Sequence, residues 1–189
     1  MANVSVERIE RFEGSDLGDL CDATETAILA GGGFGWINPP PRGVLERYWK
    51  GVLLVPERTL FVGRLDGTIA GSAQLVRPPR NNEAQAFAAT LTTNFVAPWA
   101  RGHGLARALT VAVEDAARAD GFHYLGLDLR ETLTAAIQLY ESLGFVRWGT
   151  NPNYAMVDRR MIAGHYYSKR LRLPGRQASR PARGSGAKA

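Results

Sequence analysis

The sequence has almost no cysteine and lacks any long apolar run. Its single cysteine, Cys21, cannot form an internal disulfide, and one thiol is too few for a structural zinc cluster, which excludes a disulfide-rich secreted scaffold. No stretch approaches the roughly 18 uninterrupted apolar residues of a membrane-spanning helix, and the N-terminal MANVSVERIERFEG has no hydrophobic signal-peptide core. We therefore expect a cytoplasmic protein without a membrane segment or a metal, held together by packing alone.

The remaining composition is that of an ordinary globular domain. The 189 residues are 45% hydrophobic and 22% charged, which excludes disorder of the whole chain and fits one domain. Residues 172–189 are rich in Gly, Pro, Ser and Ala and carry five basic residues and no acid, which accounts for the whole net charge of +5. We predict a folded domain over residues 1–171 and a disordered basic tail over residues 172–189. A basic tail can attract phosphates, but nucleic-acid binding is the weaker interpretation because no aromatic residues are interleaved for stacking.

Helical and extended patterns alternate along the first 171 residues, which predicts a mixed α+β fold. The expected strands cover residues 4–9, 59–65, 68–76, 86–97, 124–130, 145–149 and 160–171. The expected helices cover residues 15–30, 43–54, 104–120 and 134–143. Asp66-Gly67 predicts a tight hairpin, and Gly31 to Pro41 predicts a surface loop that is either a plain connector or an aromatic lid carrying Phe34 and Trp36.

A glycine-containing loop precedes the helix expected over residues 104–120. In APWARGHGLARAL, Gly102 and Gly104 lie where a strand gives way to that helix. Free amides and the helix dipole favour an anion at such a place, and glycine leaves space for a phosphate. The spacing matches neither the Walker A loop nor the Rossmann loop, so nucleotide hydrolysis and hydride transfer are disfavoured. From spacing alone, a simple turn remains the alternative.

The segments LTTNFVAPWARGHGLARAL and LYESLGF resemble the GNAT superfamily of acyl-CoA-dependent N-acetyltransferases. That family's loop has Gln or Arg, two residues, Gly, one residue, then Gly or Ala, and Arg101, Gly104 and Ala106 match it. The resemblance implies the GNAT fold, a mainly antiparallel, splayed mixed sheet flanked by helices, with acetyl-CoA as cosubstrate. The closing segment NPNYAMVDRRMIAGHYYSKRL is similar to that of tabtoxin-resistance acetyltransferases, which favours direct attack by a primary amine of a small molecule in a ternary complex. A protein N-terminus or lysine as acceptor, an inactive CoA-binding module and a homodimer all stay open.

The same resemblance implies which residues hold the cofactor. Backbone groups of two residues would hold the pantetheine arm where the fourth strand bulges, and the glycine loop would wrap the pyrophosphate. Two small alanines would let the following helix approach the cofactor. The implied cofactor-binding residues are Phe95, Val96, Arg101, Gly102, His103, Gly104, Leu105, Ala106, Ala135 and Ala136.

Acetyl transfer to an amine needs a base for the ammonium and an acid for the departing thiolate. Tyr140 lies where the family places the general acid, although spacing alone also allows a core aromatic. Asp128 corresponds to an acid of the tabtoxin-resistance type and is the candidate base, the alternative being a solvated strand residue. Those enzymes carry a Glu where this chain has Thr90. The other candidates for the base are a held water and three side chains, Glu131, Glu83 and His165.

Overall fold

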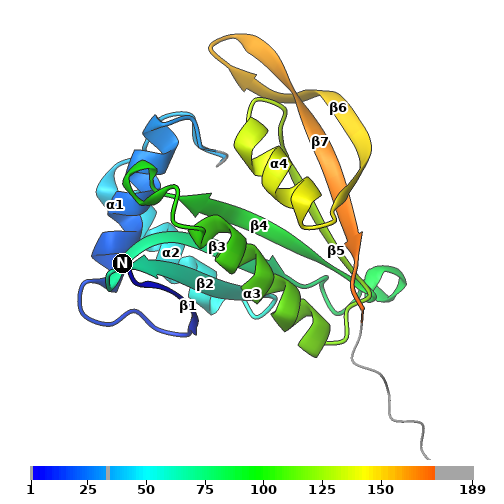
Figure 1. Cartoon of the computed structure of the whole chain (residues 1–189), viewed down its shortest axis with the longest axis horizontal. Coiled ribbons are helices and arrows are strands. Elements are labelled where there is room, and N and C mark those ends of the chain that lie inside the picture. The colour runs from blue at the N-terminus through cyan, green and yellow to red at the C-terminus, as the bar shows by residue number, and fades with distance from the viewer. Residues whose placement is uncertain (1, 33–34, 173–189) are drawn as a thin grey trace, which may run out of the picture.

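The computed structural model describes residues 2–32 and 35–172, so the predicted tail lies outside the described residues from position 173 onward. The strands are β1 (Val4–Ile9), β2 (Arg58–Leu65), β3 (Thr68–Val76), β4 (Ala88–Val96), β5 (Tyr124–Arg130), β6 (Val146–Val157) and β7 (Arg160–Arg170) (Figure 1). The helices are α1 (Asp16–Leu29), α2 (Arg42–Leu54), α3 (Leu105–Ala119) and α4 (Thr134–Ser142), with short 3₁₀ turns η1 (Glu83–Gln85) and η2 (Pro98–Ala100). The predicted α+β fold is confirmed.

One mixed sheet runs through the described residues in the order β1-β2-β3-β4-β5-β7-β6. All neighbouring strands are antiparallel except β4 and β5, which run parallel. Their parallel pairing covers only residues 88–90 against 124–126. Beyond that short seam the two strands diverge (Figure 1), so the sheet is splayed in the way the resemblance implies.

Helices cover both faces of the N-terminal half of the sheet. Side chains alternate across β2, so that Leu60 and Val62 join the core under α1 and α2, whereas Phe61 joins the core under α3. Cys21 is fully buried in the first of these cores. Among the described residues, none of the helices has the length and apolar character needed to cross a membrane.

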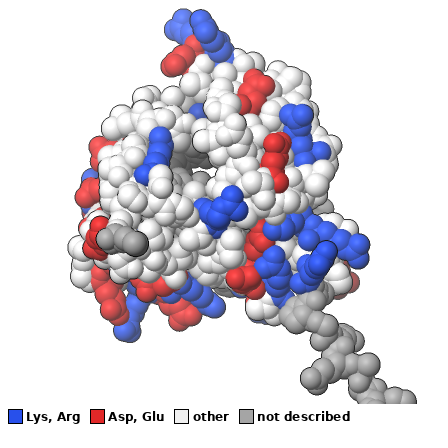
Figure 2. All heavy atoms as spheres, in the orientation of Figure 1, with Lys and Arg blue, Asp and Glu red and all other residues white. Residues whose placement is uncertain are grey.

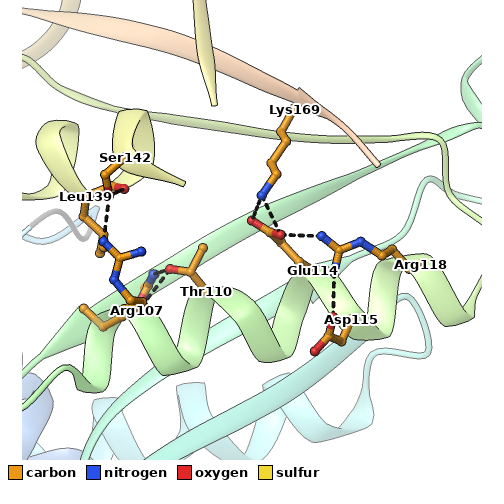
Figure 3. A network of polar contacts seen from close by, with 10 residues as sticks. Arg107, Thr110, Glu114, Asp115, Arg118, Leu139, Ser142 and Lys169 are labelled. Carbon is orange, nitrogen blue, oxygen red and sulfur yellow. Dashed lines mark hydrogen bonds and ion pairs between the residues drawn. The ribbon is translucent and has the colours of Figure 1, made fainter. Parts of the chain in front are cut away.

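A buried carboxylate ties α3 to the far half of the sheet (Figure 3). The Glu114 side chain is 3% exposed and accepts from Lys169 Nζ at 2.6 and 2.7 Å. Glu114 also pairs with Arg118 on the same helix, at 2.7 Å. Lys169 lies on β7, so this ion cluster joins the two halves on the side where the strands diverge least.

The structure corrects the prediction for the last hairpin. We expected a strand over residues 145–149 only, but β6 continues to Val157 and pairs with β7 as far as Arg160. Asp158 and Arg159 both have positive φ, 48° and 62°, and form the two-residue turn without the glycine that usually signals such a hairpin. Pro152, which argues against a continuous strand, lies in a bulge where the pairing is interrupted.

Candidate active site

A bulge in β4 opens the sheet at the site. Thr93 has φ of 51°, and the pairing with β3 skips a residue between Ser72 and Gln74. Gly71 permits this close approach, because a Cβ there would overlap the carbonyl oxygen of Phe95. The bulge bends the end of β4 away from β5, and cavities open on both sides of the gap.

The first cavity, which we call the donor cavity, has a volume of about 530 Å³ and lies beside the start of α3. The β4 bulge, the glycine loop and the first turn of α4 form its walls, and Arg107, Thr132 and Leu139 contribute without having been predicted. Nine of the ten residues implied for cofactor binding line it: Phe95, Val96, Arg101, Gly102, Gly104, Leu105, Ala106, Ala135 and Ala136. The tenth, His103, is an exposed residue of the loop and does not line the cavity.

The wall at the start of α3 suits an anion. Gly104 caps the helix with φ of 79°, and no side chain caps its N-terminus. A Cβ on Gly102 or Gly104 would meet no described atom within 4 Å, so the glycines leave open space beside the first amides of the helix. Because uncapped amides and the dipole of this 15-residue helix favour negative charge, these residues fit a pyrophosphate. Arg107 Nη2 donates to Ser142 Oγ at 2.8 Å and so ties α3 to α4 beside the cavity (Figure 3).

The second cavity, the acceptor cavity, has a volume of about 740 Å³. Its walls come from β4, β5, residues 35–37, Tyr48 on α2 and the end of β6. Trp36 of the predicted lid lines it and packs edge-on against Tyr48, with ring centroids 5.1 Å apart, whereas Phe34 lies outside the described residues. Figure 2 shows the molecule hollowed near its middle, with a rim of mainly uncharged atoms.

Tyr140 lies where the two cavities meet. It is one of four residues that line both cavities, and only 6% of it is exposed. Its ring packs edge-on against Phe145 at 5.6 Å between centroids. Burial raises the pKa of Tyr140 to about 12, although the neighbouring Asn94 amide opposes the rise. The phenol therefore keeps its proton at neutral pH and can donate it into either cavity.

A polar chain runs from this junction to the start of α3. Asn94, which also lines both cavities, donates from Nδ2 to Thr110 Oγ1 at 2.8 Å. The Thr110 hydroxyl in turn donates to the carbonyl oxygen of Ala106 at 2.8 Å. Asn94 Oδ1 is buried and has no hydrogen-bond partner among the described residues. The chain thus links the residue shared by the two cavities to the first turn of α3.

Of the four side chains considered as base, only Asp128 lines a cavity. It lies on β5 in the wall of the acceptor cavity and accepts a hydrogen bond from the Tyr154 hydroxyl. Glu131 Oε1 instead accepts from the backbone amide of Ala163 at 3.3 Å. The other two line neither cavity: Glu83 lies in η1, and His165 Nδ1 is 3.0 Å from Thr150 Oγ1.

Tyr154 and Arg130 are among the polar residues of the acceptor cavity that sequence reasoning missed. Arg130 Nη2 donates to the carbonyl oxygen of Gly32 at 3.0 Å, which connects β5 to the loop after α1. Alternation along β5 could have indicated Arg130, since it shares a face with Asp128. Within residues 2–32 and 35–172, no group of three or more His, Cys, Asp or Glu side chains is placed to hold a metal ion.

Comparison with known proteins gives consistent matches. The acetyltransferase (GNAT) family model matches residues 25–145. An uncharacterized N-acetyltransferase in the hisH-hisA intergenic region of Azospirillum brasilense is 72% identical over 132 residues, covering 70% of this chain and 79% of that protein. A mycothiol acetyltransferase of Paenarthrobacter aurescens is 34% identical over 104 residues, or 55% of this chain and 32% of that longer protein. The structure of a phosphinothricin acetyltransferase from Sinorhizobium meliloti in complex with acetyl-CoA superposes with a TM-score of 0.74 at 20% identity, covering 96% of this chain and 94% of that one.

Proposed function

Because the chain belongs to the GNAT family of acyl-CoA-dependent N-acetyltransferases, we propose that it transfers the acetyl group of acetyl-CoA to a primary amine of a small molecule. The observation that carries the proposal is the meeting of the donor and acceptor cavities at Tyr140. An amine in one cavity can reach a thioester in the other only at this junction. Both substrates would therefore be bound together, and the amine would attack directly in a ternary complex.

On the donor side, the residues of the cavity match the parts of acetyl-CoA. The first amides of α3 and the loop from Arg101 to Ala106 would hold the pyrophosphate, and His103 on this loop would contribute only from the exposed side. Backbone groups of Phe95 and Val96 would hold the pantetheine arm, and Ala135 and Ala136 keep α4 close without bulk. The thioester supplies the acetyl group and a thiolate leaving group.

At the junction, two side chains would move protons. Asp128 would take the proton from the acceptor ammonium, directly or through a water, because an alkyl ammonium with a pKa near 10.4 is not nucleophilic at neutral pH. Tyr140 would give its proton to the departing sulfur, since its raised pKa keeps it protonated until that step.

The walls of the acceptor cavity support a small acceptor. Residues 35–37 bound one side and residues 154–157 bound another, which encloses a volume suited to one small molecule. The mycothiol and phosphinothricin acetyltransferases are named for small molecules, and the likeness of the closing segment to the tabtoxin-resistance type supports a small acceptor.

The test is release of free thiol from acetyl-CoA in the presence of a panel of primary amines. The panel should contain 2-phenylethylamine, L-methionine, spermidine, a peptide with an internal lysine and a peptide with a free N-terminal alanine. Cys21 adds no background, because it is fully buried and burial raises its pKa to about 11. We expect turnover with a small amine and little with the peptides. Faster turnover of a peptide would establish a protein acceptor, and turnover of no amine would favour an inactive CoA-binding module.

A further inference from the structure

Tyr154 reaches Asp128 although their strands are not neighbours. Asp128 lies on β5 and Tyr154 on β6, with β7 between them. Adjacent strands lie about 4.8 Å apart, so a side chain must extend over an entire strand to connect β6 with β5. The Tyr154 hydroxyl nevertheless donates a hydrogen bond to Asp128 Oδ2. A contact over this span requires Tyr154 to leave the regular strand and its ring to cross β7, and two features of the hairpin allow this.

The first feature is the bulge in β6. Asn151 pairs with Gly164 and Ala155 pairs with Ile162, so residues 152–154 all lie opposite Ala163. The backbone of Ala163 forms its hydrogen bonds with Glu131, just after β5, and not with β6. Its amide donates to Glu131 Oε1, and its carbonyl accepts from the Glu131 amide at 2.9 Å. The three extra residues lift Tyr154 off the regular ladder.

The second feature is the absence of a side chain at Gly164. An ideal Cβ on Gly164 would overlap the Tyr154 ring, so the ring lies directly over this position of β7. Gly164 pairs with Arg130 of β5, and the next residue on the same face, Tyr166, pairs with Asp128. Tyr166 borders the ring edge-on, with centroids 6.2 Å apart. The Tyr154 ring thus crosses β7 over Gly164 and beside Tyr166, and its hydroxyl reaches Asp128 on the next strand.

We propose that Tyr154 is a positioning residue that holds the Asp128 carboxylate toward the acceptor cavity, with Gly164 as the gap its ring requires. The inference rests on the proposed function of Asp128 as base. Tyr154 uses one carboxylate oxygen, Oδ2, and leaves Oδ1 for the acceptor ammonium. Asp128 is exposed, so without this bond its carboxylate can rotate toward solvent.

The protonation of Tyr154 supports this role. Burial, followed by the hydrogen bond to Asp128, raises the pKa of Tyr154 well above its usual value. The phenol is therefore a hydrogen-bond donor at every pH at which an acetyltransferase would be assayed. Tyr154 thus lines the acceptor cavity and donates to Asp128 through its hydroxyl.

The first experiment measures Tyr154→Phe with acetyl-CoA and 2-phenylethylamine, or the panel amine of highest turnover. We expect kcat/KM for the amine to fall about 10- to 100-fold, because a base displaced by a fraction of an ångström acts poorly. KM for acetyl-CoA should not change, since Tyr154 does not line the donor cavity. The matched control is Tyr166→Phe, which removes a hydroxyl from the same face and should stay within about twofold of wild type.

Two double-mutant cycles separate positioning from a general structural effect. In an Asp128→Asn background, Tyr154→Phe should lower kcat/KM less than twofold further. Gly164→Ala should lower kcat/KM as much as Tyr154→Phe does, because its Cβ displaces the Tyr154 ring. It should also reduce the thermal stability of the wild type, and it should reduce that of a Tyr154→Ala variant much less, since no ring is displaced there. Gly149→Ala is the control on the same hairpin, because its Cβ would make only ordinary contacts of 3.9 and 4.0 Å with Tyr166.

A measurement without any amine substrate tests the hydrogen bond between Tyr154 and Asp128 directly. The ring signals of Tyr154, assigned by their loss in Tyr154→Phe, can be recorded by NMR at neutral pH, and Asp128→Asn should shift them because the phenol then loses its carboxylate partner. Unchanged Tyr154 signals in Asp128→Asn would overturn the inference. If Asp128→Asn abolishes turnover while Tyr154→Phe does not, the positioning role is wrong and the proposed base stands. If Asp128→Asn keeps full turnover, the proposed base is wrong and the positioning role with it.

Discussion

Replacing Tyr140 by Phe tests the general acid with the least disturbance of the fold. Phe keeps the ring that packs against Phe145, so the variant loses only a hydroxyl at the junction of the two cavities. A positioned general acid contributes about 10² to 10⁴ in rate. We therefore expect kcat to fall by roughly that factor while acetyl-CoA affinity changes little. The expected loss of stability is about 1 kcal/mol or less, the net value of one hydrogen bond.

The chain offers a matched control in Tyr167→Phe. Tyr167 is 1% exposed and its hydroxyl donates to Glu141 at 3.0 Å, but it lines neither cavity. The two variants should lose comparable stability in urea unfolding, and only the Tyr140 variant should lose activity. Pre-steady-state measurement of thiol release with the best panel amine separates chemistry from product release.

The pH dependence follows from the same residue. The pKa of Tyr140 is raised to about 12, so its proton is present throughout the neutral range and is lost only as the pH approaches that value. Turnover should thus show no alkaline decline caused by Tyr140 below about pH 10. A fall of less than about fivefold in Tyr140→Phe, with chemistry limiting, would refute the general-acid role, and a water or another donor would then protonate the sulfur.

Three further predictions concern the cofactor, the ion cluster and the tail. Gly104→Val should lower acetyl-CoA affinity at least tenfold by calorimetry, because the new side chain fills the open space at the start of α3, and a folded variant with normal affinity would place the cofactor elsewhere. Glu114→Gln should cost about 3 kcal/mol in urea unfolding, since Lys169 loses its buried partner, whereas Asp115→Asn, on a side chain 66% exposed, should cost less than about 1 kcal/mol; equal losses would contradict this. Deleting residues 172–189 should leave turnover within a few-fold, because this segment is polar and rich in Gly, Pro and Ser, and a folded truncation that loses most activity would contradict it.

Local signals in the sequence were sufficient for most of the fold. The hairpin at Asp66-Gly67, the helix that ends before Gly121 and the glycine loop before α3 each depend on residues close together in the chain. Leu109 and Val113, which are fully buried, are four residues apart in α3, the spacing of the apolar face of an amphipathic helix. Such features need no knowledge of distant contacts, which explains why pattern and turn chemistry identify them.

The lining of the acceptor cavity could not be predicted from the sequence, because it depends on contacts between residues far apart in the chain. Tyr154 reaches the site only because a bulge and a glycine on the next strand combine, and Pro152 makes the segment look irregular. The burial of Glu114 was likewise hidden, because its partner Lys169 lies 55 positions away. Asp128 could be named from its strand face, but its place in the wall of the acceptor cavity, away from the other candidate bases, is visible only in the structure.

In the proposed reaction, the last hairpin would help to select the acceptor and would take no part in holding acetyl-CoA. Residues 154–157 of β6 line the acceptor cavity, whereas no residue of β6 or β7 lines the donor cavity. Under the proposed function, changes at residues 154–157 would alter which amine is accepted and would leave the lining of the donor cavity unchanged. Related proteins would then diversify their acceptors at these four positions, while the Glu114 to Lys169 cluster anchors the hairpin against α3.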